Sequence, residues 1–356
     1  MKKVLGIATL IALLVTSFCG CSGEPVDTTP KSEQPVQTEQ PGGEAASLGG
    51  YTPDKPLVIR LANASAVGEI KDQVAVKLSE LVAERSKGCI DIQVYSGGVL
   101  GDWTDTIEGL KMGMNEVVLE GFSSYASYDP SANLDAIPYL FESYDHFMKV
   151  YQGDLGEEVL DYVGETCGFK FLGAQYRGFR VTTSNKKFTN LEELKNSGLK
   201  IRVPSVESYL ILWEALGASP VVIGLTDTFT ALQQSTVDAQ ENSIIESYGH
   251  GFYDVCDYLI RTNHICGCDV FALDLNYWNG LPAEVQEVIE ECANEAALWR
   301  SEYSYNEEEK YIGMWKEAGV EIVDVDMSEF ADRVSSFTED NYPELVEWVN
   351  RIKEAA

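Results

Sequence analysis

An alternation of strand-like and helix-like segments constrains this 356-residue chain more than any other feature of its sequence. Five segments follow one another near its start: strand-like at 57–61, helical at 70–84, strand-like at 90–95, helical at 103–112 and strand-like at 117–119. The order β-α-β-α-β is typical of parallel strands joined by crossover helices. The first folded part is therefore predicted to contain a parallel sheet.

The same pattern returns further along the chain. A capping box, Thr189-Asn-Leu-Glu192, opens a short helix. The segments that follow are predicted as a strand at 200–203, a helix at 205–216, a strand at 220–223, a helix at 226–234 and a strand at 237–239. Two α/β lobes in series are the economical interpretation. From Pro282 a helical pattern continues to about residue 316, broken only by Gly313, and a helix of this length could brace both lobes.

The first 56 residues are predicted to lie outside the fold. Two lysines and an apolar run at 4–18 are typical of a signal peptide, predicted at 1–20. Cys21 follows Gly20 as in a bacterial lipobox, with Cys19 a second candidate. Residues 21–56 are rich in Pro, Gly, Ser and Thr, which predicts a disordered tether behind a lipidated Cys21. We expect an extracytoplasmic protein anchored to the outer face of the cell membrane, or else a periplasmic or secreted one.

The acidic charge narrows the classes of partner. The chain has 57 Asp and Glu against 26 Lys and Arg. Nucleic acid is excluded as a partner, because its phosphates require a basic face. An anionic small ligand is still compatible, since a few arginines inside a cleft act locally.

Catalytic and metal-binding motifs bear on whether the chain is an enzyme. The sequence has three histidines and lacks a G-x-S-x-G elbow, an H-E-x-x-H motif, a P-loop and a Gly-rich dinucleotide turn. We therefore predict a protein that is not an enzyme and has no cofactor; a surface hydrolase acting on acidic glycans, with an unidentified carboxylate pair, is the alternative class. Cys266 and Cys268 near His264 could hold a soft metal, but buried free thiols are the preferred interpretation and no metal is predicted.

Arg202 is the most informative residue of the sequence. It ends a predicted strand in Lys200-Ile-Arg-Val-Pro204, just before a predicted helix. Ligands of open α/β sheets lie beyond the carboxyl ends of strands, where a helix N-terminus also attracts anions. A guanidinium there can clamp a carboxylate with two hydrogen bonds, although a surface arginine remains the plain alternative. Arg177 and Arg180 form a second basic pair on the passage between the lobes.

Several motifs carry a resemblance to a known family. They are Gly98-Val-Leu-Gly-Asp102, Ile137-Pro-Tyr-Leu-Phe141, Gly178-Phe-Arg180, Gly198-Leu-Lys-Ile-Arg-Val-Pro204, Leu216-Gly-Ala-Ser-Pro220, Thr230-Ala-Leu-Gln-Gln234, Val237-Asp-Ala-Gln-Glu-Asn242, Phe252-Tyr253, Thr262-Asn-His264 and Leu281-Pro-Ala-Glu-Val-Gln286. In this order and spacing they resemble the solute-binding proteins of TRAP transporters, of the DctP type. The resemblance covers residues 57 to about 352.

The resemblance implies a two-lobed clamshell, like that of periplasmic binding proteins, which closes on an organic acid. In this family, the equivalent of Arg202 pairs with the ligand carboxylate, the equivalent of Arg180 usually supports or joins that contact, and the equivalent of Asn242 reaches the same carboxylate. The implied lobes are 57–178 plus about 266–306, and 179–265 plus about 307–352.

On the first lobe, the resemblance points to Asn63, Asp102 and Glu120; sugar-acid binders carry acidic residues at the last two positions. Leu225 stands where many members place an aromatic ring, and Ala239 replaces a customary glycine. Both are departures from the usual family pattern, and the first weakens any expectation of a ring stacked at that point.

The expected ligand and partners follow from these residues. Acidic groups opposite the arginines would repel a second ligand carboxylate unless they are protonated or otherwise paired. They would accept hydrogen bonds from hydroxyls or an ammonium. A hexuronate or aldonate is therefore favoured, with sialic acid or a C4-dicarboxylate as alternatives. The family implies delivery to a permease of one small and one large membrane subunit, driven by an ion gradient; an ATP-driven importer is a closer rival. We expect a monomer.

Overall fold

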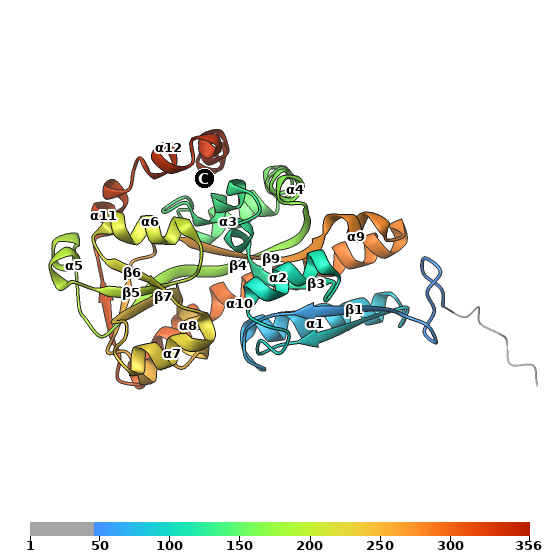
Figure 1. Cartoon of the computed structure of the whole chain (residues 1–356), viewed down its shortest axis with the longest axis horizontal. Helices are drawn as coiled ribbons and strands as arrows, with labels where there is room; N and C mark the ends of the chain where they lie inside the picture. Colours follow the sequence, from blue (N-terminus) through green and yellow to red (C-terminus); the bar gives the residue numbers. More distant parts are fainter. Residues whose placement is uncertain (1–45) are drawn as a thin grey trace, which may run out of the picture. The chain divides into compact units, whose positions relative to one another are not determined.

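The computed structural model describes residues 46–356 (Figure 1). The predicted signal peptide, Cys19, Cys21 and most of the predicted tether lie outside the described residues. Where the tether was expected to continue, residues 48–55 form two tight turns closed by the bridges Leu48–Tyr51 and Thr52–Lys55. Leu48 and Tyr51 pack against a buried cluster below the first strands, so folded structure begins ahead of Leu57.

The first sheet half has the predicted crossover arrangement. Its elements are β1 (Leu57–Ala62), α1 (Ile70–Arg85), β2 (Ile90–Tyr95), α2 (Trp103–Met112) and β3 (Val117–Gly121). Strand β1 pairs in parallel with both β2 and β3. Asp102 and Gly113 delimit α2, because Asp102 caps its N-terminus and Gly113 adopts the left-handed conformation that ends it.

The second sheet half repeats this scheme. Its elements are α5 (Leu191–Ser197), β5 (Lys200–Val203), α6 (Glu207–Leu216), β6 (Ser219–Val222), α7 (Leu225–Gln233), β7 (Ala239–Ser243) and α8 (Ile244–Gly249). Strand β5 lies between β6 and β7 and is parallel to both. Strand β7 begins two residues later than predicted, since 237–238 are irregular backbone between the turn after α7 and the strand.

Two long strands join the halves, and the sequence analysis did not predict them. They are β4 (Phe169–Ser184) and β9 (Cys266–Asp274), which are antiparallel to each other. The strand order is β2-β1-β3-β9-β4-β7-β5-β6, and β3–β9 and β4–β7 are antiparallel. The sheet is therefore mixed, which corrects the expectation of a parallel one. In Figure 1 these two strands run between the group containing β1 and the group containing β5–β7.

The remaining elements are two further strands that extend the sheet beside β4, and the helices around it. They are α3 (Tyr144–Tyr151), α4 (Asp154–Cys167), β8 (Tyr258–Arg261), α9 (Leu275–Gly280), α10 (Ala283–Glu317), β10 (Glu321–Asp324), α11 (Met327–Arg333), α12 (Phe337–Asn341) and α13 (Val346–Glu354), with short 3₁₀ turns at Phe122–Tyr125, Pro130–Ala136, Phe252–Asp254 and Pro343–Leu345. Helix α10 spans 35 residues without a break at Gly313. It contacts α1 beside the first half and α8 and β10 beside the second.

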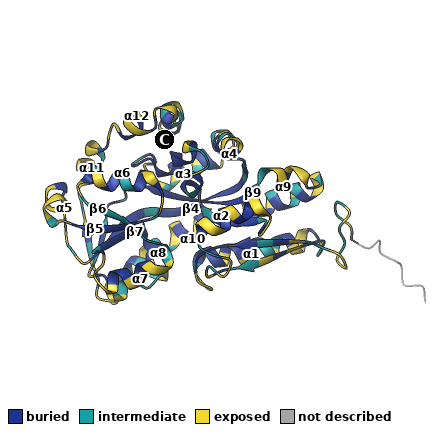
Figure 2. Cartoon of the chain, viewed as in Figure 1, coloured by how far each residue is buried: buried dark blue, intermediate teal, exposed yellow. Residues whose placement is uncertain are grey.

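The α/β class and the long bridging helix are thus confirmed, whereas the residue boundaries of the lobes stay a prediction. Figure 2 shows buried residues along the sheet and exposed ones on the outer faces of the helices. The cysteines within residues 46–356 are free and buried, as preferred from sequence. Across residues 46–356, no helix combines the length and apolar character that crossing a membrane requires.

Gly173 allows α10 to pack closely against β4. It lies where the β4–β9 register shifts between Leu172 and Gln175, and its φ is +58°. A Cβ added there would lie 2.5 Å from the carbonyl oxygen of Ala293 in α10. Only glycine combines this backbone conformation with so close an approach.

We predict that Gly173→Ala lowers the free energy of unfolding by about 2–4 kcal/mol, because it adds both left-handed strain and a backbone clash. The matched control is Gly313→Ala in α10, where a Cβ would meet nothing within 4 Å; it should stabilise by about 0.5–1 kcal/mol. Urea unfolding of both variants measures the difference. Equal stability of the two variants would show that the β4–α10 approach tolerates a side chain.

Candidate functional site

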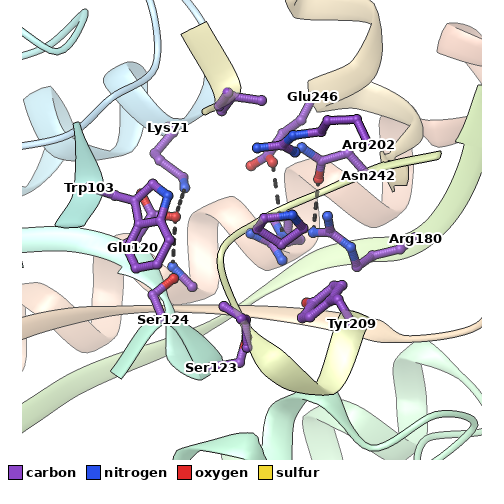
Figure 3. A pocket seen from close by; sticks show the side chains of 15 residues that line it. Lys71, Trp103, Glu120, Ser123, Ser124, Arg180, Arg202, Tyr209, Asn242 and Glu246 are labelled. Carbon is purple, nitrogen blue, oxygen red and sulfur yellow. Dashed lines mark hydrogen bonds and ion pairs between the residues drawn. The ribbon is translucent and has the colours of Figure 1, made fainter. Parts of the chain in front are cut away.

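A polar pocket lies between the two sheet halves. Its lining residues are Lys71, Trp103, Glu120, Gly121, Ser123, Ser124, Arg177, Arg180, Arg202, Pro204, Val206, Tyr209, Leu225, Asn242 and Glu246. Figure 3 shows Lys71, Trp103, Glu120 and Ser124 on one side, facing Arg202, Asn242, Arg180 and Tyr209 on the other.

Arg202 occupies the position that the sequence predicts, near the carboxyl end of β5. It is only 2% exposed, and its Nε donates to the carbonyl oxygen of Ile223 at 2.7 Å. Within the described residues 46–356, it forms no ion pair with a carboxylate. Burial lowers the pKa of Arg202 to about 10, only partly opposed by the more distant Glu241 and Asp102. A buried guanidinium with free donors is a site for an anionic group.

Arg180 is held differently, although it lines the same wall. Its Nη2 donates to Glu241 Oε1 at 2.7 Å, and its Nε donates to the other oxygen of that carboxylate. Burial alone would raise the pKa of Glu241, but Arg180 and His264 outweigh it and lower the pKa to about 2. The charge of Arg180 is thus already matched by Glu241. The Arg180 guanidinium also lies over the Tyr209 ring, with its Cζ 5.1 Å from the ring centre, which fixes the plane of the guanidinium.

Asn242 links this pair to the pocket. Its Oδ1 accepts hydrogen bonds from Arg180 Nη1 at 3.1 Å and from the Ser243 backbone N–H at 2.9 Å. The carbonyl side of the amide is therefore occupied, and the Nδ2 group remains as a donor beside Arg202 on the same wall.

The opposite wall contains a buried lysine that the sequence analysis missed. Lys71, near the start of α1, is 3% exposed. Its Nζ lies 3.0 Å from Glu120 Oε1 and 3.6 Å from Asp269 Oδ2. The helical spacing of 70–84 predicted α1 correctly but did not show that the polar Lys71 would face inward.

A network of charges lies behind the pocket. Asp269 accepts from Arg177 Nη1 at 2.9 Å and from Arg300 Nη1 at 2.6 Å. Arg300 also donates to Glu246 Oε1 at 2.6 Å. This network connects β4, β9, α8 and α10, and it neutralises Arg177, which the sequence singled out beside Arg180.

Five of the seven predicted ligand-binding residues line the pocket: Arg202, Arg180, Asn242, Glu120 and Leu225. Asn63 and Asp102 do not. The Asn63 amide donates to Ser96 Oγ at 2.9 Å and accepts from the Ser65 N–H at 3.0 Å, which shapes the loop after β1. Asp102 accepts from the Trp103 N–H at 2.8 Å as the cap of α2, so it positions Trp103 at the pocket.

Residues that the sequence analysis did not single out include Lys71, Trp103, Tyr209 and Glu246. Among these residues, only Trp103 had a signal in the sequence. It directly follows the capping residue Asp102, and a cap fixes where the next side chain points.

We predict that Glu241→Gln destabilises the fold by about 3–5 kcal/mol at pH 7, since it leaves the buried Arg180 without its charge partner. Glu241 has a lowered pKa in the fold, so its contribution is present above about pH 4.5 and is lost as the pH falls toward 2. The deficit of the variant should therefore shrink between pH 5 and pH 2. Urea unfolding across this range tests it, with Glu192→Gln on the exposed face of α5 as control. A deficit that is constant with pH would contradict the role of the charge.

Comparison with known proteins agrees with this geometry. Residues 61–343 match the family described as bacterial extracellular solute-binding protein, family 7. A sialic acid-binding periplasmic protein of Vibrio cholerae is 25% identical over 288 residues, covering 81% of this chain and 88% of that protein.

Solved structures are similar over most of the chain. A TRAP periplasmic solute-binding protein from Roseobacter denitrificans with bound L-galactonate has a TM-score of 0.77 and 26% identity, covering 83% of this chain and 98% of that one. Another, from Ochrobacterium anthropi with bound L-fuconate, has a TM-score of 0.78 and 28% identity, covering 84% and 99%.

These proteins bind solutes for transporters and are not enzymes, in agreement with the prediction from sequence. The chain belongs to the family 7 extracellular solute-binding proteins, the DctP family that serves TRAP transporters.

Proposed function

We propose that this protein captures a sugar acid of the hexuronate or aldonate type outside the cytoplasm and delivers it to a TRAP permease. The observation that carries the proposal is Arg202, a buried guanidinium in the pocket without a carboxylate partner among residues 46–356. A ligand carboxylate would supply that partner, with the Asn242 amide as a second donor. Similar proteins with bound L-galactonate and L-fuconate support this class of ligand.

The charges favour one ligand carboxylate over two. Lys71, Arg177, Arg180 and Arg300 each have a carboxylate within 4 Å, whereas Arg202 has none among the described residues. One positive charge of the pocket, that of Arg202, therefore lacks a negative partner. A C4-dicarboxylate would bring its second carboxylate toward Glu120. Sialic acid, with one carboxylate, is the alternative consistent with the Vibrio relative.

Capture depends on the ligand contacting both walls. Its carboxylate end would bind Arg202 and Asn242 beside the second sheet half, and its hydroxyls would contact residues beside the first half. A ligand stabilises the closed arrangement only by its greater affinity for that state. The closed monomer would then dock on the small and large membrane subunits of the permease.

We predict that Arg202→Ala weakens binding of sugar acids at least 100-fold, because a charge-assisted pair in a buried site is lost. A thermal-shift screen of hexuronates, aldonates, sialic acid and C4-dicarboxylates identifies the ligand, since 100 times the Kd adds about 2.7 kcal/mol of stability. Arg202→Lys should retain part of the affinity. The control is Arg351→Ala, whose Nη2 pairs with Glu158 at the surface at 2.6 Å. Unchanged affinity of the Ala variant for the true ligand would overturn the site.

We also propose that the mature protein is anchored through a lipidated Cys21 and a flexible tether. We predict that Cys21→Ser shifts the protein from the membrane fraction to the soluble extracytoplasmic fraction of a host that processes lipoproteins. Cys19→Ser is the control and should stay in the membrane fraction. Membrane retention of the Cys21 variant, or release of both variants, would exclude Cys21 as the lipidation site.

A further inference from the structure

Lys71 is in an unusual position for a lysine. It is the second residue of α1, and its side chain turns inward to line the pocket at 3% exposure. Lysines are almost never this buried unless they are paired. Figure 3 shows its ammonium on the wall opposite Arg202, with the ion pair to Glu120 drawn.

The partners of Lys71 leave part of its hydrogen-bonding capacity unused. An ammonium has three N–H donors. One reaches Glu120 Oε1 at 3.0 Å, and a second faces Asp269 Oδ2 at 3.6 Å. Burial alone would lower the pKa of Lys71, but Asp269, Glu120 and Glu246 outweigh it and raise the pKa, so Lys71 stays charged. The third donor is available to a ligand.

Glu120 has the complementary capacity. Its Oε1 accepts from Lys71 and from the Gly121 N–H at 3.0 Å. Its Oε2 has no hydrogen-bond partner within residues 46–356, and the carboxylate lines the pocket. One donor and one acceptor therefore stand side by side on this wall.

We propose that Lys71 and Glu120 form a hydroxyl-recognising subsite that determines which acids the protein binds. This inference rests on the proposed function and assigns the end of the ligand remote from its carboxylate. Adjacent hydroxyls of a sugar acid match the pair, because one can accept from Lys71 and the next can donate to Glu120. A carboxylate at that end has no hydrogen to donate, so it would leave the free acceptor of Glu120 unpaired.

A purely structural role accounts poorly for this pair. Buried ion pairs seldom stabilise a fold more than apolar residues of similar volume would. Lys71 and Glu120 come from α1 and β3, which neighbouring core residues already hold in place, such as Val74 and Leu119. Ser123 and Ser124 line the pocket beside them and extend the polar wall.

Three probes of equal chain length separate the contributions. L-Galactonate has one carboxylate and a hydroxyl-bearing end, galactarate has a carboxylate at both ends, and hexanoate has one carboxylate and no hydroxyls. Calorimetry with the full chain should give wild-type affinities that favour galactonate over both others by about 100-fold or more, as expected when buried polar groups lose their partners.

Two variants test the two halves of the subsite. Lys71→Met should weaken galactonate binding about 10–100-fold, because a charged donor is lost, and leave hexanoate binding nearly unchanged. Glu120→Gln should raise the galactarate-to-galactonate affinity ratio at least 10-fold, because the new amide can donate to a ligand carboxylate and Lys71 loses the nearer of its two carboxylate partners. Lys187→Met is the control: it removes the same charge from an exposed pair, Lys187 with Glu321, and should change neither ratio.

The double variant Lys71→Met, Glu120→Gln keeps the test decisive if the single lysine variant fails to fold. It removes both charges of the ion pair together, so no unpaired carboxylate is buried at position 120. This variant should lose the preference for galactonate over hexanoate. Unchanged affinity ratios in the Glu120→Gln and double variants would overturn the subsite while the proposed function stands. Wild-type protein that binds galactarate as tightly as galactonate would also overturn it. Absence of binding to any sugar acid in the thermal-shift screen would instead overturn the proposed function, and the subsite with it.

Discussion

The carboxylate of Asp269 is the interaction on which most of the interior depends. It lies on β9, a strand that joins the two sheet halves, and it is fully buried. Arg177 from β4, Arg300 from α10 and Lys71 from α1 all direct their charge at it. An unpaired buried charge would be very costly, so these four elements must come together for any one of the charges to be tolerated. The pairing of Asp269 thus accounts both for the buried charges behind the pocket and for the position of α10.

Arg202 differs from these paired buried charges, and this difference allows the pocket to bind an anion. The folded protein keeps it desolvated without a carboxylate partner, which lowers its pKa. An unpaired buried guanidinium destabilises the ligand-free protein, and an anion that binds to it offsets this cost. The free energy gained by pairing Arg202 is available to hold the two walls together, as a binding protein that closes on its ligand requires.

The sequence predicted those features that rest on local patterns. The crossover units around β1 and β5 follow from hydrophobic spacing and caps, and Arg202 follows from its place at a strand end. Strand β4 was missed, because it is buried along its whole length and its aromatic and polar side chains show no alternation. Lys71 was missed for a related reason: its role comes from Asp269, almost 200 positions away in sequence, and helical spacing does not show such a contact.

The difference between local and long-range contacts also explains why Asn63 and Asp102 lie outside the pocket, although Trp103, next to Asp102, lines it. Each is a polar residue at the end of an element and bonds a backbone N–H close to it in sequence, and the remaining amide group of Asn63 bonds Ser96 rather than a ligand. The residues that face the cavity, such as Lys71 and Glu120, instead satisfy one another across elements. A polar residue held by its own turn shapes the site, whereas one held by a distant partner can retain unused donors or acceptors. Specificity is therefore expected where long-range ion pairs border the pocket, on the wall opposite the arginine that anchors the ligand.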